Sequence, residues 1–240
     1  MDLRIIADAN LLALRENPYP GRGLIIGLSG DGKHFIQVYW IMGRSPSSRN
    51  RIFIYDEKGS LRTEAVDPSQ VKNPELIIYQ AMAEDGEGWY VVSNGRQTDE
   101  IVYPFGLSDL PENWQYEPDD PNFTPRITGL LSSRHDLGFF VEILLLKRSL
   151  LGSCSRQLFR YEGLASGLGY CVTTYNGDGN PLPAFTGEPY LLPLEGDIET
   201  VAQTIWDTLN DDNKVSLAVK FIDTTTGEST LKVINKYAVR

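Results

Sequence analysis

The chain has 240 residues, of which 41% are hydrophobic and 22% are charged, and its formal net charge at pH 7 is −10. This composition argues against general disorder, and the longest apolar run, 139–146, is too short for a bilayer and contains a carboxylate. The net negative charge argues against nucleic acid, because a phosphate backbone would be repelled. We therefore expect neither a membrane nor a nucleic acid as a partner.

The first part of the chain is dominated by strand patterns that come in pairs. Each pair surrounds a turn that contains glycine, and one of these turns holds Asp31-Gly32, a strong hairpin signal. The other two turns are expected at 57–59 and 85–88. The paired ranges are 23–28 with 34–42, 51–55 with 61–66, and 76–83 with 89–93. Three hairpins in succession indicate antiparallel sheet.

The middle of the chain, 108–125, is rich in Pro, Asp and Asn and is predicted to be a long loop, which in a compact domain is usually functional or disordered. A helix is predicted over 197–209 with Asp197 as its N-cap, because apolar residues recur there at steps of three and four. Further strands are expected at 139–146, 156–161, 170–175, 215–222 and 229–233. No change of composition divides the chain, and we expect one domain spanning 1–240.

Two familiar kinds of site are not supported by the sequence. Residues 27–33 fit the phosphate-loop spacing G-x-x-x-x-G-K, but His34 stands where a hydroxyl is needed and a strand follows, so a hairpin turn is the better interpretation. The two histidines, His34 and His135, cannot build a zinc site. We predict no metal and no cofactor, although a carboxylate-only site at Asp119 and Asp120 stays open.

The N-terminal residues Met1–Arg4 do not resemble the start of a secretory signal, and we expect a cytoplasmic protein. In a reducing compartment, Cys154 and Cys171 are interpreted as unbonded core residues.

Two polar segments are candidates for chemistry. Gly43–Arg51 contains three arginines among hydroxyls and an amide, lies between two strands, and is part of a stretch from Gly32 to Tyr55 without Asp or Glu. Guanidinium groups of this kind can hold a phosphate through two parallel hydrogen bonds. Glu117–Arg126 combines carboxylates, a hydroxyl and an arginine with three prolines. The alternatives are a solvated basic loop for the first segment and an ordinary acidic surface loop for the second.

Taken together, several blocks resemble the archaeal-type IMP cyclohydrolase family. They occur in that family's order between about residues 19 and 130. The blocks are Tyr19-Pro-Gly-Arg-Gly23, Gly43-Arg-Ser45 through Ser48-Arg-Asn-Arg51, Ile77-Ile-Tyr-Gln-Ala-Met82, Ser93-Asn-Gly95 with Gln97-Thr-Asp99, and Glu117 through Arg126. The resemblance implies an α+β fold, namely an N-terminal-nucleophile-hydrolase-like αββα sandwich of antiparallel sheets between helices.

The resemblance also implies an activity. The family reaction is the cofactor-free ring closure of 5-formamidoimidazole-4-carboxamide ribonucleotide to IMP with loss of water, a step of purine biosynthesis. The enzyme is classed as a hydrolase because the reverse reaction opens a cyclic amidine C–N bond. The partner would be a small purine ribonucleotide.

The resemblance gives each candidate residue an expected role. Glu117 is expected to handle the proton, and Tyr79 to orient the substrate or donate a hydrogen bond. The residues expected to bind substrate are Arg22, Arg44, Arg49, Asn50, Arg51, Asn94, Thr124 and Arg126. Among them the four arginines before residue 60 would share the phosphate and the developing oxyanion, Asn94 and Thr124 would bind the base or ribose, and Arg126 would hold Glu117 ionised or clamp the substrate.

Two other interpretations stay open at this stage. A diverged homologue would bind purine nucleotides without turnover, and a structural interaction protein would bind no ligand. The enzyme and the diverged homologue would keep the same arginines, so the sequence does not separate them. It also leaves open whether the chain forms a homo-oligomer.

Overall fold

The structure of the chain, a computed structural model, describes residues 2–56, 60–71, 73–101, 106–134, 136 and 138–237. Within these ranges the strands form two sheets in which all neighbours are antiparallel. The first sheet has the order β11 (Tyr190–Pro193), β10 (Leu168–Thr173), β1 (Gly23–Leu28), β2 (His34–Met42), β12 (Lys214–Asp223) and β13 (Ser229–Asn235). The second has the order β3 (Ile52–Tyr55), β4 (Leu61–Glu64), β5 (Gln80–Glu84), β6 (Trp89–Ser93), β7 (Arg126–Ser132), β8 (Phe140–Arg148) and β9 (Cys154–Tyr161).

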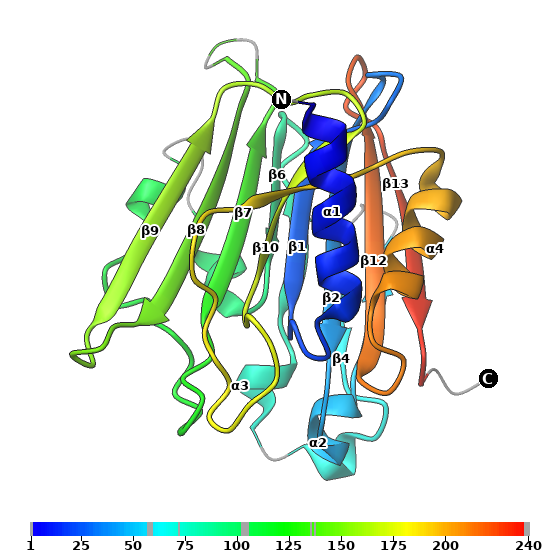
Figure 1. Cartoon of the computed structure of the whole chain (residues 1–240). Coiled ribbons are helices and arrows are strands. Elements are labelled where there is room, and N and C mark those ends of the chain that lie inside the picture. The colour runs from blue at the N-terminus through cyan, green and yellow to red at the C-terminus, as the bar shows by residue number, and fades with distance from the viewer. Residues whose placement is uncertain are drawn as a thin grey trace.

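Helices cover the outer face of the first sheet (Figure 1). These are α1 (Leu3–Glu16) and α4 (Ile198–Thr208). Leu14 of α1 and Ile205 of α4 are buried in one cluster with Ile25 and Trp40 of the sheet. Asp197 caps α4 as predicted, because its carboxylate accepts from the backbone N–H of Thr200 at 2.8 Å. No helix in the described part of the chain is long and apolar enough to cross a membrane.

The outer face of the second sheet is covered differently. Trp89, Leu130 and Leu144 of the sheet pack against Leu107 and Leu110. In the described residues, the covering segments contain the short 3-10 helices η2 (Arg96–Glu100) and η3 (Leu107–Asp109) and no α-helix. The expected α+β sandwich of two antiparallel sheets is therefore present, but in the described residues the second helical layer consists of 3-10 turns and loops. Prolines at 111, 118, 121 and 125 disfavour a continuous α-helix in the stretch that follows.

The predicted hairpins are confirmed with one difference. The strands expected at 23–28 and 34–42 are β1 and β2. The turn expected at 57–59 lies outside the described residues. His135 lies outside them as well. The strand expected over 76–83 is wrong at its start, because residues 74–77 form the short helix α3 (Pro74–Ile77) and β5 begins at Gln80. Pro74 at the first helical position favours this turn.

Helix α1 and strands β7 and β11 are among the elements that were not predicted. Helix α1 begins after Asp2, whose side chain accepts from the backbone N–H of Arg4, and it is anchored by a few apolar residues only. Strand β7 is buried along its whole length, so it has no alternation of polar and apolar residues. Strand β11 has only four residues. Helix α1 packs against β11, which is far from it in the chain, and β7 pairs with both β6 and β8.

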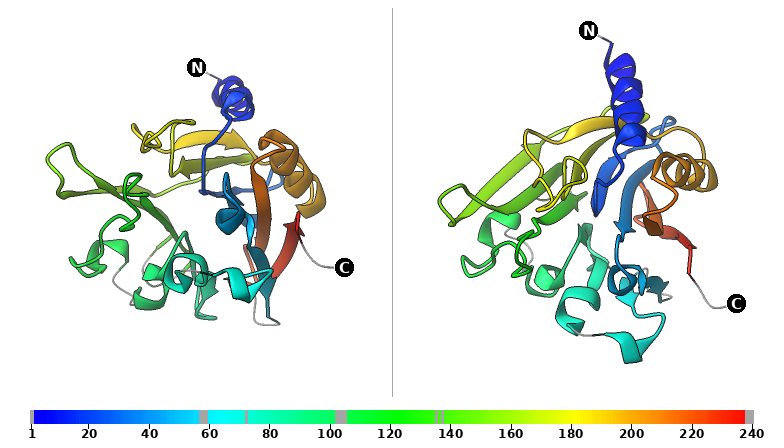
Figure 2. Two further views of the ribbon diagram at one scale, coloured as in Figure 1. Left: turned by 90° about the horizontal axis from the view of Figure 1, so that it is seen from below. Right: turned by 60° about the horizontal axis from the view of Figure 1, so that its bottom comes forward.

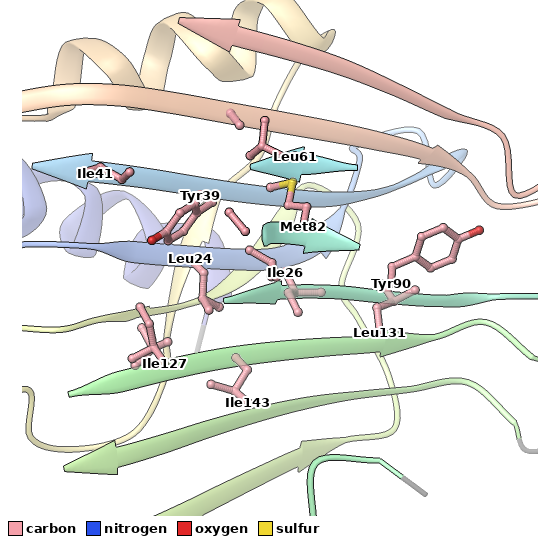
Figure 3. Packing of buried hydrophobic residues seen from close by; sticks show 14 of the residues in the cluster. Leu24, Ile26, Tyr39, Ile41, Leu61, Met82, Tyr90, Ile127, Leu131 and Ile143 are labelled. Atoms are coloured by element: carbon pink, nitrogen blue, oxygen red, sulfur yellow. The ribbon is translucent and has the colours of Figure 1, made fainter. Parts of the chain in front are cut away.

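The core between the two sheets holds the molecule together (Figure 3). Leu24 and Ile26 of β1 face Ile127 and Leu131 of β7, and all four side chains are fully buried. Gly129, between them on β7, lets the sheets approach, since a Cβ atom there would lie 2.6 Å from Cδ1 of Ile26.

We expect Gly129→Ala to lower the free energy of unfolding by about 1–3 kcal/mol, because the added methyl group overpacks the core. Ile26→Val removes the Cδ1 atom involved, and by itself should cost about 0.5–1.5 kcal/mol. The double variant should therefore cost less than the sum of the two. Urea denaturation of the three variants measures these free energies of unfolding. Additive costs would mean that contact with Ile26 does not limit the size of the side chain at position 129.

Candidate functional site

A cleft opens at the end of the sheets where α2 (Pro46–Arg49) and α3 lie, at the bottom of Figure 1. Figure 2 turns this end toward the viewer. The cleft has a volume of about 720 Å³, which is within the usual range for small-molecule sites. Its lining combines cations, carboxylates, hydroxyls and apolar groups. The residues are Tyr19, Gly21, Arg22, Met42, Arg44, Ser45, Ser47, Ser48, Arg51, Asn73, Leu76, Ile77, Glu117, Asp119, Asn122, Thr124, Tyr175 and Leu182.

A buried ion pair of Arg22 and Glu117 lies in this cleft. Nη1 and Nη2 of Arg22 donate to the two carboxylate oxygens of Glu117 at 2.9 and 2.8 Å. The two residues are 7% and 4% exposed. Burial lowers the pKa of Arg22, but the charge of Glu117 and the hydroxyls of Tyr79 and Tyr39 raise it well above its usual value. Arg22 is therefore a permanent cation that holds Glu117 through both oxygens.

Two distant segments fix the position of Arg22. Its backbone N–H donates to the Thr174 hydroxyl at 3.0 Å, and its Nη1 also donates to the carbonyl of Asn94 at 3.1 Å. Gly21, with φ of 74°, turns the chain into β1, and a Cβ atom there would lie 2.2 Å from the Thr174 hydroxyl. The Tyr-Pro-Gly-Arg-Gly block thus delivers its arginine to the cleft from a turn that needs glycine.

Arg126, the first residue of β7, stands beside the same carboxylate. Its Nη1 lies 3.7 Å from Oε1 of Glu117 and donates to Gln97 at 3.1 Å. Its guanidinium stacks over Trp114, and its Nε has no hydrogen-bond partner among the described residues. Burial lowers the pKa of Arg126, and Glu117 partly opposes this. Gly95 makes room for the group, because a Cβ atom there would lie 2.2 Å from Nη1.

In the arginine-rich segment, 43–51, some of the predicted site residues line the cleft and others do not. Arg44 and Arg51 line the cleft. Arg51 is 6% exposed and donates from Nε to the carbonyl of Ser48 at 2.9 Å and from Nη2 to that of Met42 at 3.1 Å. Arg44 stacks over Tyr19. These contacts hold both guanidinium groups at the wall of the cleft.

Arg49 and Asn50 do not line the cleft. Arg49 donates to the carbonyl of Gly43 at 3.0 Å. The Asn50 amide donates to the carbonyl of Asp67 at 2.8 Å and accepts from its N–H at 2.7 Å. Both residues brace the segment that carries Arg44 and Arg51.

Tyr79 and Asn94 are buried outside the lining of the cleft. The hydroxyl of Tyr79 shares a hydrogen bond of 2.6 Å with that of Tyr39. Asn94 is fully buried; its amide nitrogen donates to the carbonyl of Pro125 at 2.8 Å, and its oxygen accepts from the N–H of Ile127 at 2.9 Å and from Gln97 at 3.2 Å. The Asn94 side chain therefore joins the loop before β7 to the end of β6.

Thr124 lies in the cleft with groups that the sequence analysis did not single out. These include Tyr175 and Leu182, which follow β10 in the second half of the chain. Tyr175 stacks on Tyr19 and shares a hydrogen bond with the Thr124 hydroxyl. No local signal distinguishes Tyr175 from the other aromatic residues of that region. Only the pairing of β10 with β1 brings it to Arg22.

Fold and site together define a class: an α+β protein with two facing antiparallel sheets and an arginine-lined cleft at one end. The chain belongs to the family of IMP cyclohydrolase-like proteins, whose family model matches residues 19–227. The match extends the predicted resemblance well beyond residue 130. Neither the curated proteins nor the solved structures contain a match to this chain.

Proposed function

We propose that the protein is an IMP cyclohydrolase, which closes the ring of 5-formamidoimidazole-4-carboxamide ribonucleotide to give IMP and water. The observation that carries this proposal is the buried Arg22–Glu117 pair inside an arginine-lined cleft. Membership of the IMP cyclohydrolase-like family supports it. The partner is then a purine ribonucleotide, and the reaction needs neither metal nor cofactor. A cytoplasmic location and the absence of membrane or nucleic-acid partners stay predictions.

Positioning supplies a large part of the proposed catalysis. A carboxamide is a weak nucleophile, so holding it against the formyl carbon is worth effective molarities of about 10⁵ M or more. Arg44 and Arg51, on the wall of the cleft, are suited to a phosphate because guanidinium groups can bind it through paired hydrogen bonds. With the phosphate held there, the base would lie toward Arg22 and Glu117.

Proton transfer and charge stabilisation are assigned to the buried pair. Each oxygen of Glu117 accepts one hydrogen bond from Arg22 and keeps a further lone pair for the amide proton of the substrate. In this proposal Arg22 and Arg126, which both lie beside Glu117, stabilise the negative charge that develops on the formyl oxygen. Tyr79 lies outside the lining of the cleft and is hydrogen-bonded to Tyr39, so this scheme gives it no direct contact with the substrate.

The architecture is compatible with the N-terminal-nucleophile-hydrolase-like fold. Two facing antiparallel sheets with helices on the first sheet support this assignment, but an architecture by itself does not define a reaction. In the proposed reaction the attacking nucleophile belongs to the substrate, so a nucleophilic side chain is not needed.

One observation favours a second candidate, a nucleotide-binding homologue without turnover. Both oxygens of Glu117 are already held by Arg22, an arrangement that also suits a purely structural ion pair. A spectrophotometric assay of ring closure on the formylated ribonucleotide separates the two. Turnover by the wild-type protein supports the enzyme, whereas IMP binding without turnover supports the binding protein.

The phosphate assignment predicts different effects for two arginines of the same segment. Arg44→Ala should weaken IMP binding about 10- to 100-fold, because charge-assisted hydrogen bonds contribute about 1.5–3 kcal/mol each. Arg49→Ala is the matched control: Arg49 lies outside the cleft lining and braces the segment, so any loss of affinity in this variant should be the same for IMP and for inosine. Calorimetric titration with IMP and with inosine measures both.

Inosine, which has no phosphate, should bind wild type and Arg44→Ala alike. Equal losses for IMP and inosine in Arg44→Ala would contradict a phosphate contact at Arg44.

A further inference from the structure

We infer that Asp119, Thr124 and Tyr175 form a proton relay that ends in the cleft, with the Tyr175 hydroxyl as the group that meets the ligand. The chemistry of the relay rests on the proposed function. Its existence rests on three side chains that line the cleft and are joined by hydrogen bonds. No step assigned above to Glu117 or Arg22 uses these groups.

The geometry of the relay is continuous. The backbone N–H of Thr124 donates to Oδ1 of Asp119 at 2.6 Å, which fixes the carboxylate against the Thr124 side chain. Thr124 Oγ1 is bonded to Oδ2 of Asp119 on one side and to the Tyr175 hydroxyl on the other. Thr124 and Tyr175 are 3% and 4% exposed. The bond between Thr124 and Tyr175 is therefore largely shielded from water, while Asp119 is partly exposed.

The direction of the hydrogen bonds depends on a single proton. An ionised Asp119 can only accept, so Thr124 must donate to it and accept from Tyr175, whose oxygen then offers a lone pair to the cleft. A proton on Oδ2 of Asp119 reverses the chain: Asp119 donates to Thr124, Thr124 donates to Tyr175, and Tyr175 donates into the cleft. The backbone N–H of Thr124 is satisfied by Oδ1 in both states.

The surroundings of Asp119 shift its equilibrium toward the protonated form. Burial raises the pKa of Asp119, the two hydrogen bonds from Thr124 lower it, and the charges of Glu117 and Arg22 act in opposite directions, with a net rise. Burial also raises the pKa of Tyr175, which Arg22 opposes. Glu117 and Arg22 are thus the charged groups that face the relay, while Arg44 and Arg51 line the same cleft.

In the proposed reaction the relay gives one proton and takes one back. As the carboxamide nitrogen bonds to the formyl carbon, the C=O π electrons move to oxygen, which takes a proton from Tyr175 while Asp119 resupplies Tyr175 through Thr124. Glu117 takes the excess proton from the attacking nitrogen. The C–O bond then breaks, the departing hydroxyl takes the proton from Glu117 and leaves as water. The former formamide nitrogen forms the new C=N bond and returns its proton through Tyr175 to Asp119.

The relay can be tested without any ligand. The ¹³Cζ resonance of Tyr175, assigned with Tyr175→Phe, should shift as pH is raised through the titration of Asp119, because the hydroxyl changes from donor to acceptor. The shift should vanish in Asp119→Asn and in Thr124→Val, which lacks the hydroxyl. It should persist in Thr124→Ser, which keeps the hydroxyl, and in Glu117→Gln.

Turnover tests whether the reaction uses the relay. Thr124→Val should lower kcat about 10²- to 10³-fold with little change in IMP affinity, the range of acid–base contributions. Thr124→Ser should recover most of that loss.

The outcomes separate the relay from the proposed function. A Tyr175 resonance that does not follow Asp119, or follows it equally in Thr124→Val, overturns the relay whatever the activity. Equal turnover of the Val and Ser variants shows that the reaction does not use it. A wild-type protein without turnover refutes the cyclohydrolase proposal, while the resonance still decides whether the relay exists.

Discussion

Replacing Glu117 by glutamine is expected to lower turnover about 10²- to 10⁴-fold while IMP affinity changes little. The amide has nearly the same size as the carboxylate, but it cannot take a proton at neutral pH. The two oxygens of Glu117 hold Arg22 at 2.8–2.9 Å, and one of these bonds to Arg22 is retained by the amide oxygen. Steady-state turnover together with calorimetric IMP titration gives the result.

The kinetic pattern of Glu117→Gln discriminates between roles. A loss confined to KM would mean that Glu117 binds substrate and does not transfer protons. An unchanged kcat would move the base to Asp119, the other carboxylate among the described residues that line the cleft. The melting temperature of the variant must be measured alongside, so that any loss of folded protein is not counted as lost catalysis.

Arg22→Met is expected to lower the free energy of unfolding by about 3–5 kcal/mol, the usual cost of removing one partner of a buried ion pair. Glu117, which is 4% exposed in the wild-type protein, would keep Arg126, at 3.7 Å, as its nearby cation among the described residues. Arg22→Met/Glu117→Leu removes both charges, so it should be clearly more stable than the sum of the two single variants predicts. Urea denaturation of the four proteins measures the coupling.

An exposed pair provides the matched control. Arg62 donates to Glu64, and the Arg62 side chain is 61% exposed. Arg62→Met should cost less than about 1 kcal/mol, because exposed ion pairs contribute little. If Arg22→Met were as mild as Arg62→Met, the buried pair would not be a structural determinant of the cleft.

Local sequence patterns were sufficient to predict those elements whose conformation is set by residues close together in the sequence. The Asp31-Gly32 turn predicts the β1–β2 hairpin because the turn itself sets the pairing. Asp197 predicts the start of α4 because an N-cap acts within one turn of helix. Strand β7 and the short helix α3 could not be found in this way, since burial on both sides and a proline-started turn leave no clear periodicity.

The candidate site was predictable only in part. Resemblance to the family selected Arg22, Glu117 and Arg126, which the structure brings within hydrogen-bonding or ion-pair distance of one another. It did not distinguish Arg44, which lines the cleft, from Arg49, which braces the segment. The two lie five residues apart, Arg44 before α2 and Arg49 at its end, and the direction of each side chain is set by contacts of the folded chain.

The sequence by itself determined the antiparallel sheets, the proline-rich loop after residue 107 and the residue types available for chemistry, because turn, cap and strand preferences act over a few residues. The tertiary structure alone decided which of those residues meet. Pairing of β1 with β10 carries Tyr175 to the cleft, and pairing of β6 with β7 places Arg126 near Glu117. These encounters depend on packing between segments as far as 152 residues apart, which no local pattern encodes.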